Sequence, residues 1–551
     1  MQNSHVIRGK IVDLFNNSIT TGTLHITDGR VRHIEPGSFA DESALPYIMP
    51  GFVDSHVHVE SSMLIPSEFA RLAVAHGTVG TVSDPHEIAN VCGIDGVRYM
   101  IENGRTVPFK FNFGAPSCVP ATEFETAGAS LTVAEVEELL KLDEIRYLSE
   151  MMNFPGVLNN DPDVMAKIAA AHRLNKPVDG HAPGLRGDAA ANYIKAGIST
   201  DHECFTADEA LDKLQLGMKI LIREGSAAKN FEALIDLLHD HAASIMFCSD
   251  DKHPDSLELG HINVLARRAV QKGIDVFKVL RAACVNPVLH YKLDIGLLQP
   301  GDPADFILVN NLKEFDVTAT YIDGKQVAAN GKAQFARVQQ PASARINNFN
   351  CEVVNTDQLA ITDTHDNFEL FSNNIIGALD GQLITEKLTG RIKRCNGFIE
   401  ASPDEDVLKI VVVNRYRPAV PAKAFIKNFG IQKGALASSV AHDSHNIVAV
   451  GSSDELLARA INAVIRVKGG ISCVSETASK ILPLPVAGLM TDEDGYEVSR
   501  AYTEIDQMAR SLGSSLQSPF MTLSFMALLV IPKLKLSDLG LFDGDDFNII
   551  S

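Results

Sequence analysis

Tryptophan is absent from this 551-residue chain, and aromatic residues make up only 6% of it. Cysteine occurs eight times, but the eight are scattered and no two form a CxxC pair. This distribution argues against a cysteine zinc site and against a disulfide framework. A reducing, cytoplasmic location is therefore expected.

Long hydrophobic runs and an excess of basic residues are also lacking. The N-terminal stretch MQNSHVIRGKIVDLFNN contains no apolar segment typical of a secretory signal. The longest apolar stretch, 520–531, is too short to span a membrane and predicts a buried strand or core helix. With 69 acidic and 49 basic residues the net charge is −20, which disfavours nucleic acid and anionic membranes as partners. We expect a small-molecule ligand instead.

The composition, 45% hydrophobic and 21% charged, is typical of a globular protein, and the length predicts about three domains. Residues 1–48 alternate apolar and polar residues around turn signals such as Asp28–Gly29, which predicts hairpins. A similar pattern returns at 301–335. We therefore predict one small composite β domain built from 1–48 and 300–345; two independent β segments are the alternative.

Between these segments, at 49–299, strand and helix patterns alternate. Helix starts are indicated by Thr132 with Glu135, by Thr206 with Glu209, and by Asp161–Pro162. Eight strand–helix units over about 250 residues are typical of a TIM-like (β/α)8 barrel. An open doubly wound sheet is the competing α/β fold. The eight predicted strands are 52–58, 78–84, 109–114, 145–150, 177–181, 198–202, 218–223 and 244–250.

The first predicted barrel strand ends in His56 and His58. Residues i and i+2 of a strand face the same side, so both imidazoles are available to one metal ion. Later strands also end in residues able to bind metal, and in a barrel these ends converge on one face. The sequence therefore predicts a metal site there, with contributions from segments 83–87, 149–150, 179–181, 201–203, 223–224 and 249–251.

Residues 336–400 have the composition of an irregular, linker-like stretch. They lead into a separate C-terminal α/β domain, predicted to span 346–551. Within it, 408–414 predicts a buried strand, and 438–450 predicts two strands joined by a polar turn. His442, Asp443 and His445 in that turn have side chains that bind metal or substrate in other proteins; a structural role is the alternative.

Taken together, the motifs resemble those of the bacterial adenine deaminase family in the amidohydrolase superfamily. The resemblance covers nearly the whole chain and rests on DSHVHVESS, SDPHEIANV, LSEMMNFPGV, VDGHAPG, CSDD and AHDSHNIVAVG. It implies two divalent metal ions, manganese or iron, although the ligand types are also compatible with zinc. His56, His58 and Asp250 would bind the more buried ion, and His181 and His202 the second. Glu150 would bridge the two, where many superfamily members have a carboxylated lysine.

The resemblance also implies hydrolytic deamination of adenine to hypoxanthine and ammonia by a metal-activated hydroxide, in purine salvage or catabolism. Asp250 would carry the proton from the hydroxide to the departing amine. A homo-oligomer, either dimer or tetramer, is expected. Seven residues are candidates for substrate binding: Glu60, Asp84, His86, Glu203, Arg223, His442 and His445.

Two other functions are compatible with parts of the sequence. Cyclic-amide hydrolases such as dihydroorotases and hydantoinases resemble this chain in barrel and metals, but they typically carry the bridging lysine that Glu150 replaces. A non-catalytic scaffold, like the metal-free relatives of these hydrolases, would require lost metal ligands, and all six are present.

Overall fold

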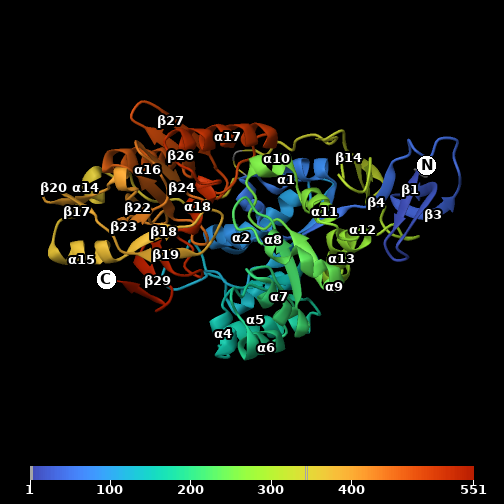
Figure 1. Cartoon of the computed structure of the whole chain (residues 1–551), viewed down its shortest axis with the longest axis horizontal. Coiled ribbons are helices and arrows are strands. Elements are labelled where there is room, and N and C mark those ends of the chain that lie inside the picture. Colours follow the sequence, from blue (N-terminus) through green and yellow to red (C-terminus); the bar gives the residue numbers. More distant parts are fainter. Residues whose placement is uncertain (1–3, 342, 344, 551) are drawn as a thin grey trace.

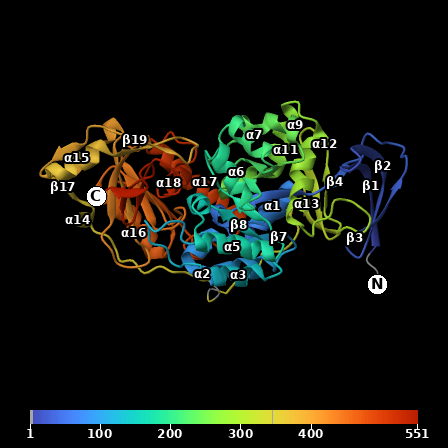
Figure 2. The same cartoon turned by 90° about the horizontal axis from the view of Figure 1, so that it is seen from below.

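The structure is a computed structural model that describes residues 4–341, 343 and 345–550. Its elements form three parts along the long axis of the molecule, seen in two orthogonal views (Figure 1 and Figure 2). The N-terminal hairpins lie at one end, a barrel of strands and helices lies in the middle, and the C-terminal sheet lies at the other end. The helices that the structure describes include none with the length and apolar character needed to cross a membrane.

The first part is a sheet that draws strands from both sides of the barrel. Its order is β16-β15-β14-β13-β4-β1-β2-β3, and β4 joins the two halves by pairing with β1 on one side and β13 on the other. This arrangement confirms the composite β architecture, while the exact domain limits stay a prediction. The strands are β1 (Ser4–Asp13), β2 (Ser18–Thr27), β3 (Arg30–Pro36), β4 (Tyr47–Pro50), β13 (Phe306–Val309), β14 (Val317–Ile322), β15 (Lys325–Ala329) and β16 (Lys332–Ala333).

The middle part contains all eight strands that the sequence predicted. They pair in parallel as a five-stranded sheet, β5 to β9, and a three-stranded sheet, β10 to β12. Single parallel bridges, Val178 to Ile198 and Val57 to Asp250, connect the two sheets and close the barrel. The strands are β5 (Phe52–Val57), β6 (Thr78–Ser83), β7 (Lys110–Ala115), β8 (Ile145–Met151), β9 (Val178–Gly180), β10 (Thr200–Asp201), β11 (Lys219–Arg223) and β12 (Ile245–Cys248).

Helices cover the outside of the barrel and begin largely where the sequence indicated. Thr132 and Glu135 form a reciprocal capping box at α3, and Asp161 caps α5. Thr206 caps α7, but the Glu209 carboxylate accepts from the Gly184 and Phe205 amides rather than returning to Thr206, so that box is not reciprocal. The helices are α1 (Pro66–Ala73), α2 (His86–Gly104), α3 (Val133–Leu140), α4 (Phe154–Leu158), α5 (Pro162–Arg173), α6 (Gly187–Lys195), α7 (Ala207–Gln215), α8 (Phe231–Leu234), α9 (Leu238–His241), α10 (Pro254–Leu259), α11 (Ile262–Gln271), α12 (Val276–Leu280) and α13 (Asn286–Tyr291).

The C-terminal part is built on an eight-stranded sheet of order β19-β18-β23-β22-β25-β24-β26-β27. The polar turn lies between β24 and β25, as predicted, and the apolar stretch 520–531 begins as a core helix, α18. The strands are β18 (Ile375–Ala378), β19 (Thr385–Leu388), β22 (Leu408–Val413), β23 (Ala422–Lys427), β24 (Gly434–Ser438), β25 (Ile447–Gly451), β26 (Gly470–Ser475) and β27 (Ser479–Pro483), and the main helices are α16 (Asp454–Val467), α17 (Gly495–Ser511) and α18 (Pro519–Phe525).

The prediction of an irregular stretch over 336–400 is wrong beyond residue 355. From there the chain forms regular elements, and β18 pairs with β23 inside the large sheet. Polar and turn-forming residues in this region hid short strands whose partners lie far along the chain. The additional elements of this part are α14 (Thr356–Leu359), β17 (Ile361–Thr362), α15 (His365–Asn373), β20 (Lys393–Cys395), β21 (Phe398–Glu400), β28 (Leu534–Ser537), β29 (Gly540–Asp543) and β30 (Asn548–Ile550).

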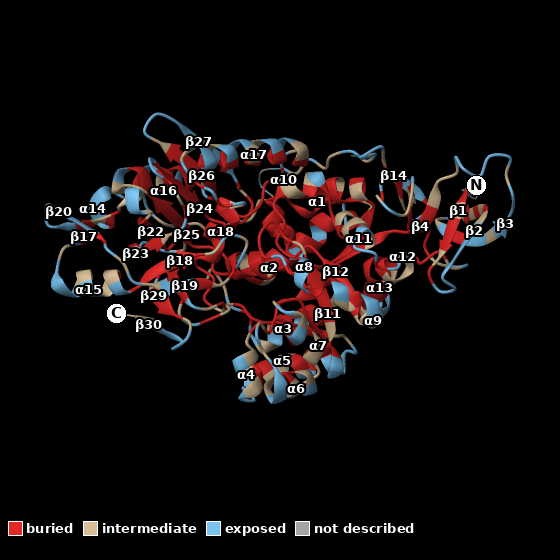
Figure 3. Cartoon of the chain, viewed as in Figure 1, coloured by how far each residue is buried: buried red, intermediate tan, exposed pale blue. Residues whose placement is uncertain are grey.

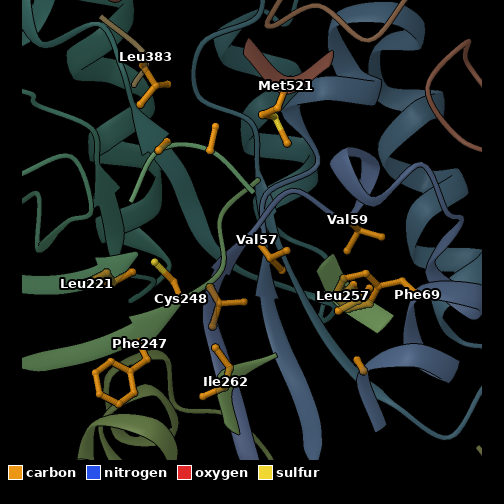
Figure 4. Packing of buried hydrophobic residues seen from close by; sticks show 14 of the residues in the cluster. Val57, Val59, Phe69, Leu221, Phe247, Cys248, Leu257, Ile262, Leu383 and Met521 are labelled. Carbon is orange, nitrogen blue, oxygen red and sulfur yellow. The ribbon is translucent and has the colours of Figure 1, made fainter. Parts of the chain in front are cut away.

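One apolar core runs from the barrel into the C-terminal part. Burial is concentrated in the strands of both parts, whereas α5 and α6 expose their outer faces (Figure 3). Figure 4 shows Met521 of α18 and Leu383 above the barrel side chains Val57 and Cys248, and all four belong to the same buried cluster. Continuous apolar burial is the main force that holds two packed units together. The C-terminal part is thus fixed over the end of the barrel where β5 terminates.

Candidate metal centre and active site

Six candidate metal ligands meet at the C-terminal ends of the barrel strands. His56 lies on β5 with His58 just after it, Glu150 lies on β8, and His181, His202 and Asp250 follow β9, β10 and β12. Each is between 0 and 5% exposed. Burying so many ionisable groups is costly unless they are paired or bind metal. The strand ends of the barrel converge as expected, and they bring the six candidate ligands together.

Glu150 lies between two groups of donors. Its Oε1 is 3.2 Å from His58 Nε2 and 3.7 Å from His56 Nε2. Its Oε2 is 2.7 Å from His181 Nδ1 and 3.3 Å from His202 Nε2. Each carboxylate oxygen thus faces a different pair of imidazoles, as a ligand that bridges two ions must.

Asp250 completes the first group. Its Oδ1 lies 3.2 Å from His58 Nε2 and 3.5 Å from His56 Nε2, while Oδ2 accepts a 2.6 Å hydrogen bond from Arg223 Nη1. The backbone of Asp250 is left-handed, with φ of 55°. Non-glycine residues adopt that region seldom, and often at functional sites.

Charges inside the site favour the ligand forms of both carboxylates and of His56. Burial opposes protonation of His58, His181 and His202, but Glu150 and neighbouring carboxylates raise the pKa of all three. Burial alone would raise the pKa of Asp250, but Arg223, His56 and His58 hold it well below its usual range. Burial likewise opposes ionisation of Glu150, yet His202 and His181 keep its pKa well below the ordinary value. Burial and the neighbouring His202 lower the pKa of His56, which favours the neutral imidazole. Both carboxylates are therefore ionised near neutral pH.

The donor set fits divalent metal ions. Ligand atoms about 2.1 Å from a common tetrahedral centre lie about 3.4 Å apart, close to the spacings around Glu150 Oε1. Donor atoms of His56, His58 and Asp250 lie within 4.8 Å of one another, and so do those of His56, Glu150 and His202. Nitrogen and carboxylate oxygen donors suit manganese, iron or zinc.

Buried networks behind the donors fix their orientation. Asp54 accepts from the Ser249 amide at 3.0 Å and lies 2.7 Å from His261 Nε2, which couples β5 to the chain just before Asp250. Lys213 Nζ donates to Asp201 at 2.6 Å and to Glu209 at 2.8 Å. Asp201 in turn accepts from the amides of Ala182 and Glu203, the residues that follow His181 and His202. Such outer contacts hold metal ligands in place.

Gly180 permits the close approach of β9 and β10. A Cβ at this position would lie 2.4 Å from the Thr200 carbonyl oxygen, which no side chain tolerates. Glycine allows the two backbones to come together. His181 and His202 can therefore face the same oxygen of Glu150.

The comparisons with known proteins agree with this geometry. The sequence model described as "Amidohydrolase family" matches residues 47–327, and the one described as "Adenine deaminase C-terminal domain" matches residues 382–548. Proteins named adenine deaminase from Salinibacter ruber and Sulfurovum sp. are each 54% identical to this chain. The alignments cover 100% and 99% of this chain, respectively, and 99% of each relative. The chain belongs to the adenine deaminase family.

Solved structures also align with part of the chain. A β-aspartyl dipeptidase from Fervidobacterium islandicum aligns with a TM-score of 0.47 at 15% identity, covering 61% of this chain and 100% of that one. An enamidase described as a member of the amidohydrolase superfamily aligns with a TM-score of 0.43 at 16% identity, covering 60% of this chain and 97% of that one.

The seven residues suggested for substrate binding occupy different positions in this family member. Four of them, His86, Glu203, Arg223 and His442, line the small cavity beside the metal ligands. Glu60, Asp84 and His445 are buried but do not line it. Glu60 Oε1 accepts from the Ile88 amide at 3.2 Å, and Asp84 lies 3.1 Å from His86 Nδ1. These two contacts place Glu60 and Asp84 behind the segment that carries His86.

Glu87 connects the C-terminal part to the barrel. His442 Nδ1 pairs with its Oε1, and His445 Nε2 lies 2.5 Å from its Oε2. Burial would raise the pKa of Glu87, but His442, His86 and His445 keep it well below the usual value. The polar turn between β24 and β25 is thus anchored to the first turn of α2.

Six residues that line the cavity were absent from the predicted metal ligands and substrate-binding candidates, although sequence reasoning had named Asp443 in the polar turn and had placed Glu87 and Asp251 in strand-end segments. Three are acidic: Glu87, Asp251 and Asp443. Asp443 Oδ1 lies 3.4 Å from His86 Nε2, and Asp251 accepts a 2.5 Å hydrogen bond from Ser61. All three lie inside motifs that carried the resemblance. Their acidic side chains, next to candidate ligands in the sequence, could have indicated that they line the site. The other three are apolar and gave no signal: Met152, Leu383 and Leu528.

Proposed function

We propose that this protein hydrolyses adenine to hypoxanthine and ammonia, a reaction of purine salvage or catabolism. The observation that carries the proposal is Glu150, whose two oxygens face separate pairs of histidines. The family to which the chain belongs supplies the substrate. Adenine offers a planar carbon that bears an amine, which an activated hydroxide can displace.

The six ligands would hold two divalent ions, with manganese or iron preferred. His56, His58 and Asp250 would hold one ion, His181 and His202 the other, and Glu150 both. Such ions, when bound, lower the pKa of a coordinated water so that hydroxide is available near neutral pH.

Asp250 is the group placed to carry the proton. Its Oδ2 is held by Arg223, which leaves Oδ1 as the oxygen that faces the ligands and the cavity. Oδ1 would accept the proton of the attacking hydroxide and pass it to the departing amine. Because Arg223 stabilises the ionised carboxylate, protonated Asp250 gives up its proton readily.

His86 is the best candidate to contact the purine. It lines the cavity, and its two buried ring nitrogens lie near the Asp84 and Asp443 carboxylates without a well-directed hydrogen bond to either. Asp84 on one side and Asp443 on the other, at 3.1 and 3.4 Å, raise the pKa of His86 well above its ordinary value against the effect of burial. A protonated His86 would donate to a purine ring nitrogen and stabilise the charge that develops there. The other side chains around the base would be those of Glu203, Arg223 and His442.

The experiment is to measure ammonia and hypoxanthine released from adenine by manganese- or iron-loaded protein. Dihydroorotate, hydantoin and adenosine are tested alongside. Asp250→Asn should abolish turnover with metal still bound, whereas Asp240→Asn, at an exposed position on α9, should not. Turnover of a cyclic amide without turnover of adenine would reject the proposal. Adenosine should be a poor substrate, because ribose has little space beside the metal ligands.

We also propose that the chain works as a homo-oligomer, a dimer or a tetramer, inside the cytoplasm. Light scattering of the metal-loaded protein tests the assembly state. A mass equal to that of one chain at micromolar concentration would reject the oligomer without affecting the proposed reaction.

A further inference from the structure

Two cavities of very different size meet beside the metal ligands. The catalytic cavity, into which His86 and Asp250 point, has a volume of about 20 Å³. A cavity of that size holds about one water molecule, while ligand pockets usually measure about 300–1,000 Å³. A neighbouring cavity of about 690 Å³, here called the outer chamber, falls within that range. A purine therefore fits the outer chamber but enters the catalytic cavity only if side chains move.

The outer chamber adjoins the catalytic cavity at one shared side chain. Met152 lines both, and it follows β8, the strand that carries Glu150. Two consecutive residues also line different cavities: Leu528 lines the catalytic cavity and Leu529 lines the outer chamber. The wall between the cavities is thus thin and apolar.

Part of the structure around that wall is held by buried hydrogen bonds. Lys535 Nζ donates to the carbonyl oxygens of Leu383 at 2.6 Å and Phe525 at 2.9 Å, which fixes two C-terminal segments that flank the cavities. Met152 differs, because its unbranched thioether side chain has several rotatable bonds and adapts to what packs against it. Rotation of Met152 is the smallest movement that would connect the two spaces.

The lining of the outer chamber suits an uncharged planar ring. Phe154 and Phe205 from the barrel face Val530 and Phe547 from the C-terminal part. The single ionisable side chain among the described residues that line it, Asp545, is 3.4 Å from the Lys533 ammonium. Aromatic faces stack on purine bases, and a chamber without an unpaired cation disfavours phosphate.

We infer that the outer chamber is a binding subsite for the free purine base, occupied before the base passes Met152 into the catalytic cavity. This inference rests on the proposed function for the identity of the base. It also provides a selectivity step, because the chamber accepts a neutral base and disfavours a nucleotide.

The absence of tryptophan from the chain provides a direct test. Phe154→Trp, in an Asp250→Asn background that prevents turnover, places a unique fluorophore in the outer chamber. Adenine should reduce its fluorescence saturably, and adenosine monophosphate should not. Leu289→Trp, at a site 54% exposed on α13, is the matched control and should not respond. An unchanged signal from the Phe154→Trp protein over adenine concentrations that saturate wild-type turnover would refute the subsite.

A kinetic test fills the chamber. Val530→Trp should lower kcat/KM for adenine by about tenfold, because the larger side chain takes up space that the base would occupy, with bound metal and circular dichroism unchanged. If that variant does not fold, Ala121→Phe, at another position in the lining of the chamber, should lower kcat/KM in the same way. Wild-type kcat/KM in a folded, metal-loaded variant of either kind would refute the subsite. Absence of adenine turnover by the wild-type protein would instead refute the proposed function, so the two failures are distinguishable.

Discussion

Replacing Glu87 with alanine tests whether the C-terminal part is required for a competent site. Glu87 is 1% exposed, and its two oxygens receive His442 and His445, which lie more than 350 positions away in the chain. Removing one partner of a buried ion pair costs about 3–5 kcal/mol, because the remaining charge is left unpaired. Two histidines would lose their acceptor in Glu87→Ala. The free energy of unfolding should therefore fall by an amount in the upper part of that range.

The loss should appear in stability and in catalysis together. His442 lines the catalytic cavity, and its ring lies 5.4 Å from that of Phe525, so freeing it loosens one wall. If all of the lost energy opposes assembly of the site, kcat/KM for adenine falls by about 10³-fold or slightly more. Bound metal should be unchanged, because Glu87 lies outside the six proposed ligands.

The assay combines a thermal melt, metal analysis and adenine kinetics. Glu102→Ala is the control, since Glu102 lies on the same helix and is exposed. A Glu87→Ala protein that melts and turns over as wild type does would refute the reasoning. Loss of metal from that variant would instead place Glu87 among the groups that hold the ions.

Three further predictions concern the site and its supports. Glu150→Ala should lower bound metal and abolish turnover while circular dichroism stays native, and full metal content with normal activity would reject its bridging role. Burial opposes protonation of His442, but Glu87 and Asp251 raise its pKa to about 9, above the ordinary 6.5. The stabilisation that protonated His442 provides should therefore be complete below pH ~6.5 and be lost as the pH rises through ~9. The difference in Tm between wild type and His442→Asn should shrink over that pH range. A constant difference in Tm would contradict the ion pair. Lys213→Met should cost about 3–5 kcal/mol by leaving Asp201 and Glu209 without their buried cation, and should weaken binding of one of the two ions, as judged by metal titration.

Much of the barrel could be predicted from the sequence, because its evidence is local. Each strand is a short apolar run, and its ligands follow within a few residues, so His56, Glu150 and Asp250 could be assigned to strand ends without tertiary information. The convergence of those ends is a property of the fold class. The adenine deaminase family could likewise be identified from contiguous motifs.

The region after the barrel was harder to predict, because its evidence is not local. The strand β18 is only four residues long, and pairing with β23, about fifty positions away, makes it part of the large sheet. The composition of 336–400 therefore indicated a linker where the structure has regular elements. Short strands of this kind are specified by their neighbours more than by their own residues.

The sequence by itself predicted the candidate ligand types, their order along the strands and the chemistry they would support. Only the tertiary structure decided which side chains face one another across the molecule. The pairing of Glu87 with His442 and His445, and the role of Met152 between the two cavities, depend on contacts between the barrel and the C-terminal part. Such contacts follow from how two apolar surfaces pack, and packing leaves no periodic pattern in the sequence of either partner.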